Sequence, residues 1–343
     1  CRQQLSVWCR MEAKLLLATL LGLLACAQAR ITLADVRAAE WEQFKQEFQK
    51  SYDDESEDRL RMQVFEDNKR IIDAHNERWA AGQETYEMGV NEYTDLLQHE
   101  FDSLFAAPAE QLEEDEELEF LDDDADEDDE EPQGHKDEVD WRILGAVTPV
   151  RHEGHFNNSW AFAAAGVVES RRFISSGVLL ELSKQQLIDC AGVKGRKKIQ
   201  RALKYIRSKK GIEPERAYPY RGAPGRCSFK KQLISASIRK YHHSSTGSEK
   251  TLAANVHKGP VAAMISRDAI RFFKSGVFHN ANCKKSEDYG VLIVGYGHSE
   301  NYGDFWLLKT SLGTSWGEKG YMRLARNRKN LCGIANWAYY PDI

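Results

Sequence analysis

The chain has 343 residues, of which 42% are hydrophobic and 29% are charged, and this is a globular composition at a length typical of about two domains. It excludes a collagen, a coiled coil and a wholly disordered chain. The net charge of −6 conceals two halves: residues 30–138 hold 10 Lys and Arg against 37 Asp and Glu (−27), and residues 139–343 hold 34 against 15 (+19). Such asymmetry favours self-association or an anionic partner.

A single apolar run stands near the start of the chain, from Leu15 to Ala27, and it is too short to span a membrane. It follows Met11 and Lys14 and ends in small residues, which is typical of a secretory signal peptide. We therefore predict a non-native extension at 1–10, a signal peptide at 11–29 cleaved after Ala29, and an extracellular or endolysosomal protein without a membrane span.

Residues 30–105 are predicted to be a helical domain. Apolar and polar positions repeat three and four residues apart on one helix face, at Glu57, Arg61, Phe65, Asn68, Ile72 and Asn76. Alternation at Gly89, Asn91, Tyr93 and Asp95 predicts a short extended segment. Residues 106–138 follow as a flexible acidic linker, because 110–131 contains sixteen acidic residues and no Lys or Arg.

From Val139 onward the pattern predicts a mixed domain of helices and strands. The expected helices are Ser159–Ser176, closed by Gly177, and Leu182–Cys190. The expected strands are Pro260–Ser266, Gly290–Tyr296, Phe305–Lys309 and Gly320–Leu324.

Four cysteines follow the predicted cleavage point: Cys190, Cys227, Cys283 and Cys332. In an oxidising compartment two disulfides are expected, and the residues alone leave three pairings open. Because none lies in a C-x-x-C pattern, neither a zinc site nor another metal or cofactor is predicted.

Several segments resemble papain-like cysteine proteases of the cathepsin L type. The matching stretches are Val147–Phe162, Leu187–Cys190, Gly290–Gly297, Trp306–Lys309, Trp316–Glu318 and Cys332–Ile334. The helix face above resembles the ERFNIN pattern of the inhibitor prodomain, and Gly89–Asp95 resembles its GNFD motif, with Tyr93 in place of Phe. The resemblance implies an α+β, two-lobed papain-like fold at 139–343, with an α domain and a β-barrel-like domain, preceded by the prodomain at 30–105. It also implies the pairs Cys190–Cys227 and Cys283–Cys332.

The same resemblance places the catalytic positions, and each has changed. Ser159 stands where the family has its nucleophilic cysteine, Tyr289 where it has the histidine, and Thr310 where it has the orienting asparagine. Glu153 replaces the oxyanion-hole glutamine, where a carboxylate repels a developing oxyanion. Leu312 replaces a shielding tryptophan. Because a phenol is a poor base at neutral pH, these changes together predict lost activity.

We therefore expect a pseudoprotease that acts by binding. Its expected partners are its own prodomain and acidic linker, and then peptides, cathepsin-like proteases or sulfated glycans. Two alternatives stay open: residual hydrolase activity of the cysteine endopeptidase type, and a protease inhibitor acting through its prodomain. Fold alone does not choose between them.

Two further features bear on binding. Asn157-Asn158-Ser159 is an N-glycosylation pattern, which predicts a glycan at Asn157. A basic stretch is a candidate anion-binding face, formed by Lys194, Arg196, Lys197, Lys198, Arg201, Lys204 and Arg207, with Lys209 and Lys210 beyond it. Nucleic acid is not expected, since no base-reading motif or aromatic platform accompanies the cations.

Overall fold

The computed structural model describes residues 32–105, 138–193, 197–244 and 247–343. The predicted extension and signal peptide lie outside these residues, as do nearly all of the predicted acidic linker and the cations Lys194 and Arg196. Two compact units make up the chain, and the boundary falls between Glu66 and Asp67. Within the described ranges, no helix combines the length and the apolar character needed to cross a bilayer.

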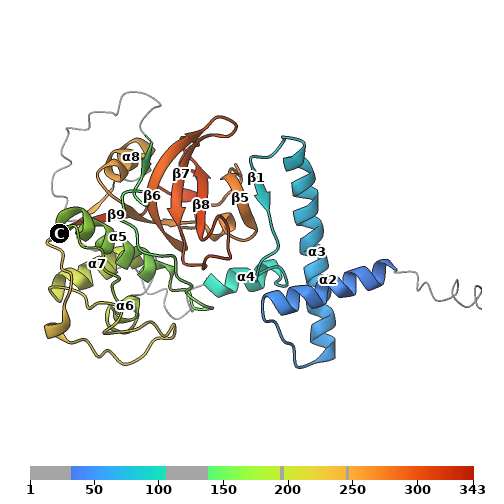
Figure 1. The fold of residues 1–343 in the computed structure, drawn as a ribbon, viewed down its shortest axis with the longest axis horizontal. Coiled ribbons are helices and arrows are strands. Elements are labelled where there is room, and N and C mark those ends of the chain that lie inside the picture. The colour runs from blue at the N-terminus through green and yellow to red at the C-terminus, as the bar shows by residue number, and fades with distance from the viewer. Residues whose placement is uncertain (1–31, 106–137, 194–196, 245–246) are drawn as a thin grey trace, which may run out of the picture. The chain divides into compact units, whose positions relative to one another are not determined.

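Most of the α-helices come early in the chain, and most of the strands follow the last of them (Figure 1). The α-helices are α2 (Leu33–Glu47), α3 (Glu55–Ala80), α4 (Gln98–Phe105), α5 (Ser159–Ser176), α6 (Lys184–Cys190), α7 (Lys198–Ser208) and α8 (Glu249–His257). The strands are β1 (Tyr86–Met88), β2 (Val139–Asp140), β3 (Lys240–His243), β4 (Val261–Ile265), β5 (Phe273–Phe278), β6 (Tyr289–Ser299), β7 (Gly303–Lys309), β8 (Tyr321–Ala325) and β9 (Ala338–Asp342).

The first unit contains α2 and the start of α3. Helix α2 begins with a capping box, in which the Thr32 side chain accepts from the Asp35 amide and the Asp35 carboxylate accepts from the Thr32 amide. Trp41 and Phe44 of α2 pack against Phe65 of α3, with ring centroids 5.6 and 4.7 Å apart. These buried aromatic rings form a small core of this unit.

In the second unit, residues 83–104 (segment 83–104) extend the sheet of the papain-like domain. Strand β1 pairs antiparallel with β5. The extended part lies at β1 rather than at Gly89–Asp95, so that expectation was wrong: the Asn91 side chain accepts from the Tyr93 amide and the Thr94 hydroxyl accepts from the Asn91 amide. Such side-chain bonds to the local backbone favour a turn over a strand.

The sheet has nine strands, and its order is β1-β5-β8-β7-β6-β4-β9-β3, with β2 paired to β6. Hydrophobic residues of the strands form one core, and this core includes Tyr86, Tyr93 and Phe101 of segment 83–104. A second core gathers the apolar faces of α5, α6 and α7 against the opposite side of β4 and β6. The expected α+β papain-like fold, preceded along the chain by a helical part, is confirmed.

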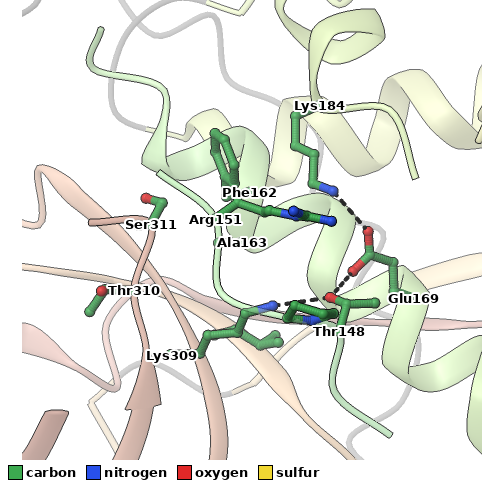
Figure 2. A pocket seen from close by; sticks show the side chains of 12 residues that line it. Thr148, Arg151, Phe162, Ala163, Glu169, Lys184, Lys309, Thr310 and Ser311 are labelled. Carbon is green, nitrogen blue, oxygen red and sulfur yellow. Dashed lines mark hydrogen bonds and ion pairs between the residues drawn. The ribbon is translucent and has the colours of Figure 1, made fainter. Parts of the chain in front are cut away.

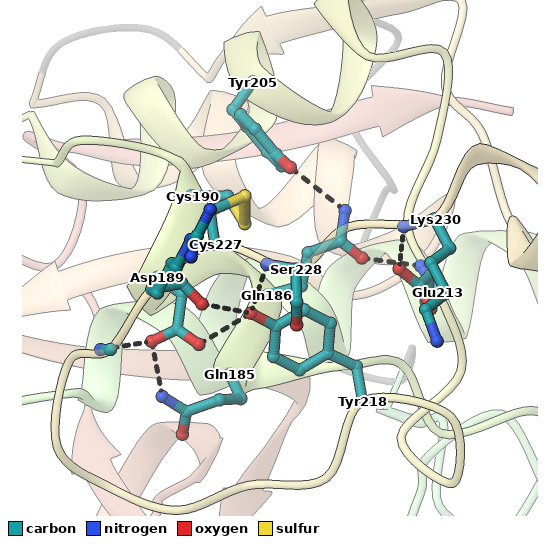
Figure 3. The surroundings of a disulfide bond; sticks show 12 residues. Gln185, Gln186, Asp189, Cys190, Tyr205, Glu213, Tyr218, Cys227, Ser228 and Lys230 are labelled. Carbon is teal, nitrogen blue, oxygen red and sulfur yellow. Dashed lines mark hydrogen bonds between the residues drawn. A yellow bond between two sulfur atoms is a disulfide. The ribbon is translucent and has the colours of Figure 1, made fainter.

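Two disulfides join the cysteines in the pairs that the resemblance implies, Cys190 with Cys227 and Cys283 with Cys332. Beside the first bridge, the Asp189 carboxylate accepts hydrogen bonds from the Tyr218 hydroxyl at 2.7 Å and the Gln185 amide at 2.8 Å (Figure 3). The end of α6 is thus tied to the loop that carries Cys227.

Candidate functional site

Ser159 is the first residue of α5 and faces the start of β6. It is 1% exposed, and its hydroxyl oxygen accepts the Gly290 amide at 2.9 Å. The two backbones approach so closely that a Cβ on Gly290 would lie 2.7 Å from the Trp160 nitrogen. Glycine is therefore required at position 290, and the Ser159 hydroxyl already has a backbone partner.

Tyr289 is the first residue of β6 and is fully buried. Its hydroxyl lies 3.1 Å from the Ser311 hydroxyl and accepts the Ser311 amide at 3.3 Å. Burial, followed by the nearby charge of Glu153, raises the pKa of Tyr289 well above its ordinary value. The phenol therefore stays protonated and serves as a hydrogen-bonding group rather than as a base.

Glu153 is a buried carboxylate in the loop just before α5. One oxygen accepts the Asn158 amide at 2.7 Å, and the other accepts the Ser311 hydroxyl at 3.0 Å. Burial raises the pKa of Glu153 to about 7, although hydrogen bonds from Ser311, Asn158 and Tyr289 and the charge of His152 favour ionisation. A negative charge here lies where the helix dipole stabilises it.

Thr310 and Leu312 flank Ser311 at the end of β7. The Thr310 hydroxyl donates to the Gly320 carbonyl at 3.0 Å, and Leu312 is buried. Ser311, not Thr310, is the hydrogen-bond partner of Tyr289 at this corner. The sequence motif indicated Thr310 at this position. The sequence signal for Ser311 was that it follows Thr310 directly, because successive side chains of an extended chain point to opposite sides.

Segment 83–104 reaches the same loop of the site. Glu92 and His152 form an ion pair at 3.1 Å, and the hydrogen bond with Glu92 is the main reason that the pKa of His152 is raised. A cavity between the segment and the loop is lined by Tyr93, Leu104, Glu153, Gly154, His155, Phe156 and Asn157. No sequence pattern indicated the Glu92 contact, because the two residues are 60 positions apart.

A second polar cluster lies where α5 and α6 meet β7 (Figure 2). Glu169 is paired with Lys184 at 3.3 Å and accepts the Thr148 hydroxyl at 2.6 Å, and Lys309 donates to that hydroxyl at 3.0 Å. Burial lowers the pKa of Lys309 to about 8. For Glu169, burial is outweighed by Lys184 and Lys309, and the net effect is a lowered pKa. These residues were not recognised from the sequence.

The structure places the predicted cations Lys197, Lys198, Arg201, Lys204 and Arg207 on α7 and at its start. Lys204 and Arg207 are exposed, whereas Lys197, Lys198 and Arg201 are half-buried. The Lys197 ammonium lies 5.8 Å from the centre of the Trp337 ring. The described part of the basic stretch is therefore divided: Lys197, Lys198 and Arg201 pack on the domain, and the later cations face solvent.

Asn157 is half-buried in the loop before α5. It lines the cavity that Tyr93 and Leu104 close from the other side. In the described part of the chain, no three histidine, cysteine or carboxylate side chains come together as a metal site.

Two family models match the chain. Residues 41–101 match the cathepsin propeptide inhibitor domain (I29), and residues 135–342 match the papain family cysteine protease. Cathepsin L1 of Drosophila melanogaster is 39% identical over 344 residues, which cover 94% of this chain and 90% of that protein. Cathepsin J of Mus musculus is 36% identical over 349 residues, with coverages of 96% and 98%. The structure of digestive procathepsin L 3 from the larval midgut of Tenebrio molitor matches with a TM-score of 0.77 at 33% identity, over 90% of this chain and 99% of that chain.

Proposed function

This chain belongs to the papain family of cysteine proteases and carries a cathepsin propeptide inhibitor domain, and from the chemistry of its site we propose that it is a catalytically inactive, cathepsin L-like protein that acts by binding. The observation that carries the proposal is the network of Glu153, Ser311 and Tyr289, which fills the site with groups that satisfy one another.

The chemistry of Ser159 supports this proposal. A papain-type mechanism needs a thiolate, whose pKa a helix N-terminus and an imidazolium can lower, whereas a serine hydroxyl needs a general base. The aligned base is Tyr289, whose raised pKa keeps it protonated. The carboxylate of Glu153 stands where an oxyanion would need a donor.

Residual hydrolase activity is the first alternative, and burial argues against it. Ser311 and Glu153 are a hydroxyl–carboxylate pair with a pKa suited to base catalysis, since that of Glu153 is about 7. Both are 2% exposed in the full chain, and their oxygens bond to each other rather than face a substrate.

Inhibition of another protease through the prodomain is the second alternative. Such inhibition needs segment 83–104 to be free for a second protein. Tyr86, Tyr93 and Phe101 are instead buried in the core of this chain's own sheet. The segment is therefore engaged in cis, which favours binding by the papain-like domain or its surface.

The test is hydrolysis of peptide substrates of the cathepsin L type, measured on the chain after proteolytic removal of its prodomain. We expect no turnover above the buffer blank, with an active cathepsin L as the positive control. Hydrolysis that is present in the wild type and lost in Ser159→Ala would refute the proposal, because it would identify the hydroxyl as a working nucleophile.

A restoration experiment tests how much the surroundings matter. The variant Ser159→Cys/Tyr289→His/Thr310→Asn should still show little activity, because Glu153 keeps a carboxylate at the oxyanion position. Adding Glu153→Gln should give the larger recovery of the two variants. Turnover by the triple variant comparable to that of an active cathepsin L would show that the three positions alone abolish catalysis.

We also propose a secretory destination and a glycan at Asn157, for which the leader-like run and the Asn-Asn-Ser pattern are the support. Glycosylation acts on the chain before α5 forms, so the half-burial of Asn157 does not prevent it. Mass spectrometry of secreted protein before and after enzymatic deglycosylation should show a loss of glycan mass, with Asn157→Gln as control. An identical mass in both samples would contradict the modification.

A further inference from the structure

Helix α7 has two chemically different sides. Its apolar residues Ile199, Ala202, Leu203 and Ile206 are fully buried in the core shared with α5 and α6. On the solvent side and just after the helix, four cations are exposed: Lys204, Arg207, Lys209 and Lys210. We call these four residues the α7 face.

The four members of the α7 face have no ion pair with a carboxylate of the described residues, a property that they share with other exposed cations such as Lys258 and Lys284. Several arginines of the domain are instead paired at short range, as Arg151 is with Glu181, Arg221 with Asp189, Arg267 with Asp288 and Arg323 with Glu318. Among the ion pairs of the described residues, none involves a member of the α7 face. Part of the excess positive charge of residues 139–343 is therefore exposed at the α7 face.

The spacing of this charge suits a linear polyanion. Lys204 and Arg207 are three residues apart, which is about 4.5 Å along a helix axis, and Lys209 and Lys210 lie just beyond the end of the helix. An aromatic platform for bases is missing from this side, because the helix's aromatic residue, Tyr205, is 7% exposed and turned to the core. Stacking, on which single-stranded nucleic acid binding depends, is thus not provided by α7.

From these observations we infer that the α7 face binds a sulfated polysaccharide. The inference rests on the proposed function, since it names the partner class of a protein that acts by binding. Sulfate esters keep their charge at neutral and at acidic pH, and arginine and lysine both recognise such oxyanions. The competing explanation is that Arg207, Lys209 and Lys210 only complement the dipole at the C-terminus of α7.

The experiment is elution of the full chain from immobilised heparin in a salt gradient at pH 7.4. The test variant is Lys204→Gln/Arg207→Gln, which keeps good helix-forming residues. The matched control is Lys258→Gln/Lys284→Gln, which removes the same charge from exposed positions outside α7. We expect the slope of log affinity against log salt to fall by about 2 in the test variant, about 1 for each cation that no longer binds a sulfate group, and to be unchanged in the control.

Each outcome decides the inference. An equal fall of the salt slope in both double variants would mean that only the net charge of the protein matters. An unchanged slope in both would mean that Lys204 and Arg207 serve only the helix. Either result overturns the inference. Retention that survives on chemically desulfated heparin, or that is matched by single-stranded RNA with the same variant dependence, overturns the choice of partner. Peptide hydrolysis is measured separately on the same protein after proteolytic removal of its prodomain, so a failure here is distinguishable from a failure of the proposed inactivity.

Discussion

Two glutamates of the papain-like domain are buried to the same extent and differ in their charge. Glu153 is 2% exposed and Glu169 is 1% exposed. Burial raises the pKa of Glu153 to about 7, whereas the pKa of Glu169 is lowered, because Lys184 and Lys309 outweigh its burial. Hydrogen-bond donors surround the first carboxylate, and ammonium groups surround the second.

The difference teaches that burial alone does not set the ionisation of a site. Glu169 on α5 is the negative charge that offsets Lys184 on α6 and Lys309 on β7, so it must stay ionised. Burial raises the pKa of Glu153, and the donors Ser311, Asn158 and Tyr289 offset that rise only in part, so this carboxyl is partly protonated near pH 7. Replacing each glutamate by glutamine should therefore change the free energy of unfolding in opposite directions: a decrease at Glu169 and, above pH 7, an increase at Glu153.

The largest effect is expected for Glu169→Gln. This variant leaves Lys184 and Lys309 buried without their shared counter-charge, and breaking a buried pair in this way costs about 3 to 5 kcal/mol. Denaturant unfolding at pH 7 should show that loss in the free energy of unfolding. A loss below about 1 kcal/mol would mean that Glu215, 3.6 Å from Lys184, is a sufficient partner.

Glu153→Gln should stabilise the protein above pH 7. Because the folded pKa is raised, folded Glu153 keeps a proton that the unfolded chain releases between pH 4.5 and about 7, and the free energy of unfolding falls as pH rises through that window. The amide does not ionise, so the variant should gain at most about 3 kcal/mol at pH 8 and almost nothing at pH 4.5.

Unfolding curves of wild type and Glu153→Gln at several pH values measure this difference. His152, Tyr93, Tyr220 and Lys198 also interact with the charge of Glu153, and they are unchanged in the variant. A gain that is the same at pH 4.5 and pH 8 would contradict titration of Glu153 as its cause.

The smallest effect is expected for Tyr289→Phe. The variant removes the hydroxyl that accepts the Ser311 amide, and an unpaired buried donor costs about 1 to 2 kcal/mol. It also removes a donor to Glu153, so the pKa of that carboxyl should rise further. Thermal unfolding at pH 5 and pH 8 should show a larger loss of stability at pH 8. Equal losses at the two pH values would mean that the Tyr289 hydroxyl does not affect the ionisation of Glu153.

Much of the fold was predictable from the sequence, because local patterns determine helices and strands. The alanine-rich helix at Ser159–Ser176 forms with the expected bounds, and the strands expected at Pro260–Ser266 and Phe305–Lys309 form within one or two residues as β4 and β7. The short extended segment expected at Gly89–Asp95 was wrong because side chains there bond to the local backbone, and alternation of residue types does not reveal such bonds.

The site was predictable only in part. Motif positions located Ser159, Tyr289, Thr310 and Glu153, since each lies inside or beside a well-matched segment. Ser311 was missed because its contact with Tyr289 joins residues 22 positions apart and depends on the exact end of β7. Lys184 and Glu169 were missed because a lysine on a helix ordinarily indicates a solvent-facing position, and only the packing of α6 on α5 buries this one.

The hydrogen bond from Gly290 to Ser159 has a consequence for how this protein is detected in a cell. Electrophilic activity probes for papain-type enzymes trap a thiolate. Here the aligned atom is a buried hydroxyl oxygen, and Cys190, Cys227, Cys283 and Cys332, the cysteines of the described residues, are all in disulfides. A proteome-wide survey with such reagents would record the active relatives and pass over this chain, even where antibodies show it to be abundant.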